Sequence, residues 1–243
     1  MSKRVALYPL LPLYKFGVWS RNKLFDWKIL KSESFDIPII SIGNIAVGGT
    51  GKTPHSEYFI RMLKDRYNIA LLSRGYKRKS KGFILADENT SATLIGDEPF
   101  QIKQKFRDIT VAVDSNRCNG IRKILELRPE TNLIILDDAF QHRYVNPKVS
   151  VMLSDYNNMF YNDSLLPVGN LREPASARFR ANIVIITKCP KNIIPIDKRI
   201  MIKRVNLFPY QKLFFSSFSY SNPIAVFEEN NIKELDINCI GKG

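Results

Sequence analysis

The sequence is poor in the residues that build disulfide frameworks and zinc sites. Its 243 residues include only 3 cysteines and 2 histidines. Cys118, Cys189 and Cys239 lie far apart and form no C-x-x-C pair. An odd number of widely spaced cysteines disfavours a disulfide-stapled domain or a zinc site and is typical of reduced thiols in a cytosolic protein.

A clean hydrophobic run is also lacking. The most apolar stretch, "VALYPLLPLYKFGVW" from Val5 to Trp19, is interrupted by Pro9, Pro12 and Lys15, so it falls short of the ~20 apolar residues that span a bilayer. No small-residue cleavage site follows, which disfavours a secretory signal. Asp26 is the only acidic residue over positions 1–31, where the basic residues are Lys3, Arg4, Lys15, Arg21, Lys23, Lys28 and Lys31. Two interpretations stay open: a helix lying on an anionic membrane surface, or a helix packed on the body of the protein.

Acidic residues are outnumbered throughout the chain. The 37 Lys and Arg against 23 Asp and Glu leave a net charge of +14 and a pI near 9.7. This surplus favours anionic partners such as phosphorylated substrates or lipid headgroups. No platform of aromatic residues interleaved with basic ones is visible, so we expect no nucleic-acid partner. The sequence does not indicate an oligomeric state.

Apolar runs alternate with helical patterns, which predicts an α/β fold: a mostly parallel sheet of the P-loop NTPase type, flanked by helices. The expected strands are 37–42, 69–73, 109–113, 133–136, 149–153 and 183–187, with a further strand in "KLFFSSFSY" (212–220). The expected helices are 55–66, 98–106 and 116–127, the first with Tyr58, Phe59, Met62 and Leu63 as its apolar stripe. Beyond about residue 190 the pattern weakens, and a boundary is expected near residues 205–215.

The stretch "NIAVGGTGKTP" (44–54) follows the first expected strand and precedes a helix. In that position, backbone N–H groups and a helix N-terminus can surround a phosphate. Lys52 would reach the β- and γ-phosphates of a nucleotide, and the Thr53 hydroxyl would bind Mg²⁺. Ala46 replaces the usual leading glycine, a mild departure because Gly48 and Gly49 supply the backbone freedom. The predicted ATP-binding residues are Ala46, Val47, Gly48, Gly49, Thr50, Gly51, Lys52 and Thr53.

Two carboxylate pairs could complete such a site. Asp137 and Asp138 end the apolar run of "NLIILDDAFQH", where carboxylates can hold Mg²⁺ directly or through its water shell. Asp97 and Glu98 begin the helix expected after "IGDEPF". They are either dipole-favourable residues of the first turn or groups that accept a proton or hold the metal.

Two loops and a histidine are less decisive. The basic stretch "SRGYKRKSKG" (73–82) contains Arg74, and "LLPVGNLREP" (165–174) contains Arg172. Each is either a solvated or structural loop or a contact for substrate phosphates. His142, beside the Asp137–Asp138 pair, is ambiguous.

Together these motifs resemble one family. "PIISIGNIAVGGTGKTP", "SRGYKRKSKG", "GDEP", "VDSNR", "ILDDAFQHR" and "LLPVGNLREP" occur in the order and approximate spacing of tetraacyldisaccharide 4'-kinases, and the wording is similar to the Bacteroidetes branch. The resemblance covers about residues 5–190.

The resemblance implies ATP- and Mg²⁺-dependent transfer of the γ-phosphate to the 4'-hydroxyl of tetraacyldisaccharide 1-phosphate in lipid A biosynthesis. It also implies a two-lobed, peripheral enzyme whose N-terminal helix meets the cytoplasmic face of the inner membrane. The division that follows is an N-terminal membrane-contact segment (1–35), a P-loop kinase core (36–210) and the start of a truncated second lobe (211–243). Asp97 maps to the catalytic base, with Lys52 as the second catalytic residue. Metal-handling positions map to Thr53, Glu98, Asp137 and Asp138, and substrate contacts to Asn44, Arg74, Gln141, His142 and Arg172.

One departure bears on activity. Family members carry a downstream Asp-His-His stretch whose histidine partners the catalytic aspartate, whereas His55 and His142 are the only histidines of this sequence. We therefore expect a C-terminally truncated member of the family. The alternative is a P-loop protein that binds ATP but does not phosphorylate lipids.

Overall fold

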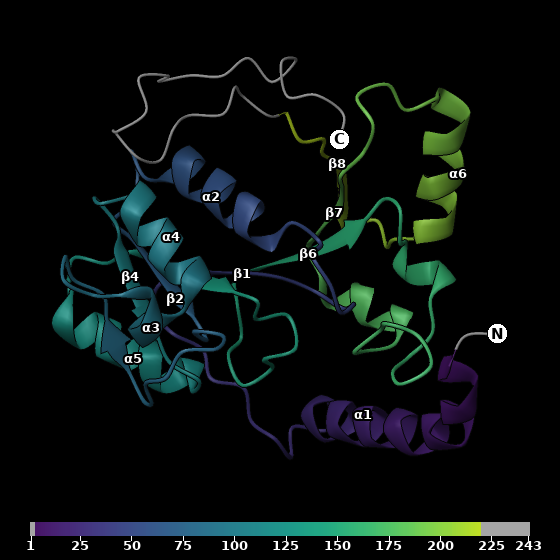
Figure 1. The fold of residues 1–243 in the computed structure, drawn as a ribbon, viewed down its shortest axis with the longest axis horizontal. Helices are drawn as coiled ribbons and strands as arrows, with labels where there is room; N and C mark the ends of the chain where they lie inside the picture. Colours follow the sequence, from purple (N-terminus) through teal and green to yellow (C-terminus); the bar gives the residue numbers. More distant parts are fainter. Residues whose placement is uncertain (1–2, 220–243) are drawn as a thin grey trace.

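The computed structural model describes residues 3–219, and its centre is one eight-stranded sheet (Figure 1). The strands lie in the order β3-β4-β2-β5-β1-β6-β7-β8. Their bounds are β1 Ile39–Asn44, β2 Ile69–Ser73, β3 Ile84–Leu85, β4 Thr110–Val113, β5 Leu133–Asp137, β6 Val149–Asp155, β7 Ile183–Thr187 and β8 Lys212–Phe215. Every pairing is parallel except that of β3 with β4. The predicted mostly parallel α/β sheet is confirmed.

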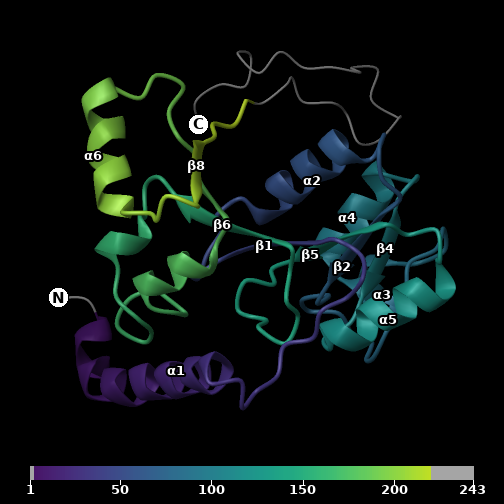
Figure 2. The ribbon, with the colours of Figure 1, turned by 180° about the vertical axis from the view of Figure 1, so that it is seen from behind.

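Helices cover both faces of this sheet, which explains why its strands are apolar without alternation. The helices are α1 Leu11–Asp26, α2 Lys52–Leu63, α3 Ala92–Ile95, α4 Asp97–Lys105, α5 Arg117–Leu127 and α6 Pro195–Val205, with 3₁₀ segments η1 Lys3–Leu10, η2 Phe160–Asn162 and η3 Ala175–Arg180. α2 and α4 pack on one face, through Phe59, Ile60 and Ile102. On the other face lie α5 and, nearer β6 and β7, η3 with α1. Figures 1 and 2 show α1 and α2 on opposite sides of the sheet.

Two helical details differ from the sequence-based expectation. Helix α6 was not predicted, because Ile196, Ile200 and Ile202 are exposed and only Met201 and Val205 are buried, so no apolar stripe marks it. In α2, the predicted stripe was half wrong. Phe59 is buried, but Tyr58 and Met62 are exposed.

The N-terminal helix does two things at once. One side of α1 packs on the protein: Phe25 is buried, and the Tyr14 hydroxyl donates to the Arg172 carbonyl at 3.0 Å. The other side leaves Leu13, Phe16 and Trp19 exposed. Over the described residues, no helix is both long and apolar enough to cross a bilayer.

Strand β8 pairs with β7, so the core sheet continues past the predicted boundary at residue 210. Residues 220–243, most of the segment predicted to begin a second lobe, lie outside the described residues, and the division into 1–35, 36–210 and 211–243 stays a prediction.

Candidate active site at the carboxyl ends of the central strands

The glycine-rich loop, residues Ala46–Thr53, connects the end of β1 to the start of α2. Gly51 adopts a φ of 82° immediately before Lys52, the first residue of α2. This left-handed conformation is accessible to glycine without strain, and it turns the chain into the helix. Asn44 holds the loop from inside, since its Nδ2 donates to the Thr50 hydroxyl at 2.8 Å. The Thr187 hydroxyl of β7 donates to the Thr50 carbonyl at 2.9 Å. The loop is thus anchored to two strands, with the α2 N-terminus behind it.

The carboxylates of β5 lie beside this loop because β5 is the parallel neighbour of β1. Lys52 Nζ is 3.7 Å from Asp138 Oδ1, and Arg172 Nη1 is 3.6 Å from Asp138 Oδ2. Asp137 is buried and accepts a hydrogen bond from the Ser56 hydroxyl of α2 at 3.0 Å. Asp138, the first residue after β5, has a φ of 46°, in the left-handed region.

Burial raises the pKa of Asp137 to about 6, and the charge of Glu98 adds to the effect. A carboxylate in this position is therefore poised to gain from a cation. Asp138 Oδ1 is likewise buried and, within residues 3–219, accepts no hydrogen bond. These two acceptors fit Mg²⁺.

The protein side chains alone do not form a complete metal site in the described residues, however. In the described part of the chain, no group of three or more His, Cys, Asp or Glu side chains is placed to hold a metal. Mg²⁺ in nucleotide sites usually takes one or two carboxylates and completes its shell with phosphate oxygens and water. The arrangement suits an ion that arrives with a nucleotide.

The Asp97–Glu98 pair occupies the first turn of α4. Gly96 precedes it with a φ of 92°, and a Cβ there would come within 2.8 Å of the Tyr76 carbonyl oxygen. The turn before Asp97 is therefore pressed against the basic loop that contains Arg74. Burial, and then the positive charge of Arg74 among other nearby charges, lowers the pKa of both Arg117 and His142.

The remaining predicted substrate contacts surround the carboxylates. Gln141 donates through Nε2 to the Asn44 carbonyl. His142 has its pKa lowered to about 4, by burial first and then by the charges of Arg117, Arg21 and Arg74, so its ring is neutral near pH 7. Its Nε2 is buried and has no hydrogen-bond partner in the described structure. The structure thus gathers the loop, Asp137–Asp138, Gln141, His142 and Arg172 at one end of the sheet, and their roles stay predictions.

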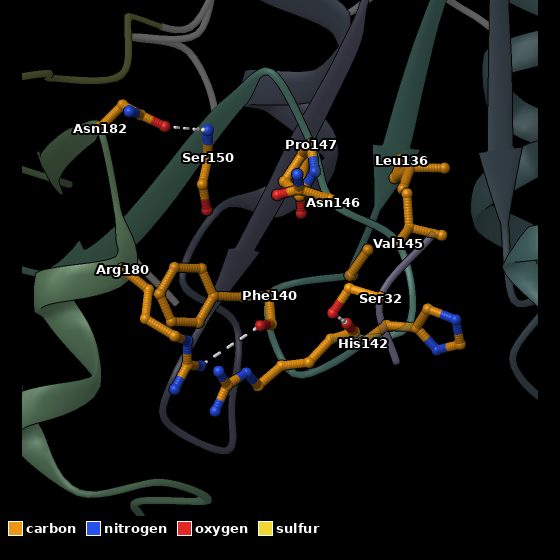
Figure 3. Close-up of a pocket in the computed structure, with 13 residues that line it drawn as sticks. Ser32, Leu136, Phe140, His142, Val145, Asn146, Pro147, Ser150, Arg180 and Asn182 are labelled. Atoms are coloured by element: carbon orange, nitrogen blue, oxygen red, sulfur yellow. Dashed lines mark hydrogen bonds between the residues drawn. The ribbon is translucent and has the colours of Figure 1, made fainter. Parts of the chain in front are cut away.

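A polar cavity of about 180 Å³ lies behind the loop that follows Asp138 (Figure 3). Ser150 and Asn182 line it from β6 and the start of β7, and the Asn182 side chain accepts from the Ser150 N–H at 2.8 Å. Phe140 and Arg180 lie on one side of it and the His142 ring on the other (Figure 3).

Sequence reasoning gave no role to Arg117, which is buried at the centre of the site. Its guanidinium donates to the carbonyls of Asp114 and Asp137, and burial lowers its pKa to about 10. The signal was present in "VDSNR", since this segment follows β4 at the same edge of the sheet as Asp137. Ser56 was also missed, because it lies inside a helix without a motif of its own.

Comparison with known proteins identifies the lineage of this site. A sequence model described as tetraacyldisaccharide-1-P 4'-kinase matches residues 3–236. The chain belongs to this family. Curated relatives named tetraacyldisaccharide 4'-kinase include a protein of Phocaeicola vulgatus, 55% identical over 235 residues, covering 95% of this chain and 64% of the relative. Another, from Bacteroides fragilis, is 59% identical over 224 residues, covering 92% and 60%. The predicted family and its Bacteroidetes branch are confirmed.

A solved structure of the family supports the fold. The "apo" form of LpxK from Aquifex aeolicus in complex with ATP is 32% identical, with a TM-score of 0.74, and the match covers 88% of this chain and 64% of that one. The chain therefore spans about 60–64% of the length of these relatives.

Proposed function

We propose that this chain binds ATP with Mg²⁺ and transfers the γ-phosphate to the 4'-hydroxyl of tetraacyldisaccharide 1-phosphate. The observation that carries the proposal is the meeting of Lys52 with Asp138 at 3.7 Å, at the mouth of the glycine-rich loop, in a chain of this family. Lys52 is the cation expected for the β- and γ-phosphates, and Asp138 is the carboxylate expected for their metal.

In the proposed mechanism, the chain's residues position the phosphates of ATP and neutralise their charge. Backbone N–H groups of Gly49–Thr53 and the N-terminus of α2 hold the phosphates, and Lys52 balances their charge. Thr53, Glu98, Asp137 and Asp138 would bind Mg²⁺ directly or through its water shell, with phosphate oxygens completing the coordination, and the ion would neutralise charge on those oxygens. Asp97 accepts the proton of the 4'-hydroxyl as that oxygen bonds to the γ-phosphorus and the bond to the β-phosphate oxygen breaks. Arg172, beside Asp138, contacts the transferred group or the sugar.

The proposed lipid substrate lies in a membrane. We propose that α1 makes the peripheral contact with the cytoplasmic face of the inner membrane. Leu13 and Phe16 are 72% and 66% exposed. Because the opposite side of α1 bonds to Arg172 and to Gln141 through Tyr14 and Arg21, the helix connects that surface to the candidate active site. The chain's net charge of +14 suits an anionic bilayer and a phosphorylated lipid.

The test is transfer of label from γ-labelled ATP to tetraacyldisaccharide 1-phosphate in mixed micelles. We expect labelled lipid with the wild-type chain and none with Asp97→Ala, while ATP binding is retained in both. Tyr58→Ala, on an exposed part of α2, is the matched control and should transfer normally. An Asp97→Ala variant with an unchanged rate would remove Asp97 from the mechanism. ATP binding without any transfer by the wild type would favour a nucleotide-binding protein that lacks lipid kinase activity.

A further inference from the structure

The segment just before Arg172 is held together by the carboxylate of Asp163, a residue that has no role in the proposed function. Asp163 Oδ1 accepts the backbone N–H of Ser164 at 2.7 Å and that of Asn170 at 3.2 Å. Its Oδ2 accepts from the Asn170 side-chain amide at 3.1 Å. One side chain therefore bonds to both ends of the turn between residues 163 and 170.

The backbone completes this closure. The Leu171 N–H donates to the Ser164 carbonyl, the Leu166 N–H to the Leu171 carbonyl and the Gly169 N–H to the Leu165 carbonyl, each at 2.9 Å. Leu165 and Leu171 are buried in the cluster that α1 and η3 share. We call residues 163–171 the Asp163 loop, a compact loop whose ends meet, of the kind that is often functional.

No space is left for a side chain at Gly169 inside the Asp163 loop. A Cβ added at Gly169 would lie 2.1 Å from the Ser164 carbonyl oxygen and 2.4 Å from Asp163 Oδ1. Only glycine therefore allows the Asp163 carboxylate to reach its N–H groups.

The outer edge of the Asp163 loop is paired with the glycine-rich loop. The Val47 N–H donates to the Asn170 carbonyl and the Arg172 N–H donates to the Ile45 carbonyl, both at 2.7 Å. Ala46 and Leu171 form an antiparallel bridge between these two bonds. The first half of the glycine-rich loop is thus held as a short ribbon against the Asp163 loop, and Arg172 emerges from that ribbon toward Asp138.

We propose that Asp163 is a positioning residue of the nucleotide site. Its carboxylate closes the Asp163 loop, which sets the path of Ala46 and Val47 before the phosphates and aims Arg172 at Asp138. Hydrogen bonds to an ionised carboxylate are roughly twice as strong as neutral ones, so Asp163 stabilises the turn beyond what its backbone bonds provide. The inference rests on the proposed function, because it takes the site to bind ATP with Mg²⁺.

Three substitutions in the full chain test this role. Asp163→Ala removes every acceptor, whereas Asp163→Asn keeps Oδ1 for the two backbone N–H groups and loses the Oδ2 acceptor of the Asn170 side chain. Gly169→Ala crowds both the Ser164 carbonyl and the Asp163 carboxylate, and it serves if Asp163→Ala is poorly soluble. Asp65→Ala, an exposed aspartate just after α2, is the matched control.

Two readouts require no lipid. In hydrogen-exchange mass spectrometry, Asp163→Ala and Gly169→Ala should speed exchange of peptides covering 44–50 and 163–172 and leave the peptides of β2 and β5 at the wild-type rate. Binding of a fluorescent ATP analogue with Mg²⁺ should weaken about tenfold. Asp163→Asn should be less impaired than Asp163→Ala in both signals, and Asp65→Ala should change neither. If transfer is observed, KM for ATP should rise with the same pattern.

Two results would overturn the proposal: wild-type exchange at 44–50 together with wild-type ATP binding in Asp163→Ala, or an Asp163→Asn variant as impaired as Asp163→Ala. Failure of the proposed function has a different signature. A wild-type chain that binds no ATP, or that labels no lipid, contradicts that function, while the exchange of residues 44–50 still decides whether Asp163 holds the glycine-rich loop.

Discussion

At the scale of single residues, the candidate site is defined by carboxylates whose environments differ. Asp137 is buried under α2 with one hydroxyl donor, whereas Asp138 is partly exposed and lies between the Lys52 and Arg172 cations. Burial and the charge of Glu98 raise the pKa of Asp137 to about 6. Its carboxyl group therefore changes protonation state within the pH range of ordinary binding assays. If this pair binds Mg²⁺ as proposed, metal binding should depend on pH.

The first prediction concerns that proton. Bound Mg²⁺ favours ionised Asp137, so affinity for ATP with Mg²⁺ should fall as pH is lowered through about 6. Fluorescence titrations between pH 5 and pH 8 measure this. Asp137→Asn should bind more weakly at pH 8 and should lack the wild-type loss of affinity at low pH. Protonation of ATP itself affects both proteins equally, so it does not contribute to the difference between them. The same pH dependence of affinity in wild type and Asp137→Asn would contradict the role given to Asp137.

The same group has the opposite effect on the protein without ligand. Its folded-state pKa is raised above the unfolded value of 3.8. The stability that Asp137 contributes is thus fully present below about pH 4 and is lost as pH rises through about 6. We therefore expect the free energy of unfolding of Asp137→Asn, measured in urea, to increase relative to that of the wild type as pH rises from about 4 to about 6.

At the scale of elements, α1 is the helix whose two sides face different surroundings. Tyr14, Arg21 and Phe25 attach it to the segments that carry Arg172, Gln141 and Tyr144. Leu13, Phe16 and Trp19 remain exposed, and the Phe16 and Trp19 rings stack with centroids 5.9 Å apart. Packing of one side of α1 on the protein is therefore confirmed, and the exposed apolar side leaves membrane contact a prediction.

The second prediction follows from that surface. Leu13→Glu and Phe16→Glu should each weaken binding to vesicles containing anionic lipid by about tenfold or more, since a buried large apolar side chain contributes about 1.5–3 kcal/mol. Co-sedimentation with vesicles measures the change. Tyr58→Glu, which alters a side chain that is 60% exposed on α2, is the control and should bind normally. Equal binding by all three variants would exclude α1 as the membrane contact.

At the scale of the whole molecule, one continuous sheet places every candidate residue. Three hydrophobic clusters cover its two faces, and β1, β5 and β6 at its centre end beside the glycine-rich loop. Leu71 of β2 is fully buried in the cluster under α2 and α4. The site is therefore held by the same packing that stabilises the fold.

The third prediction measures that packing. Leu71→Ala should lower the free energy of unfolding in urea by about 2–5 kcal/mol, from lost burial and the cavity left behind. Leu127→Ala, at the half-exposed end of α5, makes the same chemical change and should cost less than about 1 kcal/mol. Similar costs at the two positions would contradict the burial assigned to Leu71.

Local pattern by itself determined much of this protein. The buried strands were recognisable because parallel strands covered on both faces are uninterrupted runs of Ile, Val and Leu, and β2 and β7 were predicted residue for residue. The glycine-rich loop and the Asp137–Asp138 pair were recognisable because each follows such a strand, which already assigns it to the carboxyl edge of the sheet. Helix α6 escaped prediction because its isoleucines face outward.

Only the tertiary structure decided which partners these residues meet. Three contacts join segments far apart in sequence: the Ser56 hydroxyl donates to Asp137, the buried Arg117 donates to the Asp137 carbonyl, and the Val47 N–H donates to the Asn170 carbonyl. The sheet order β2-β5-β1-β6 brings those segments together. No local pattern encodes that order, because it is set by which apolar faces pack against one another once the whole sheet forms.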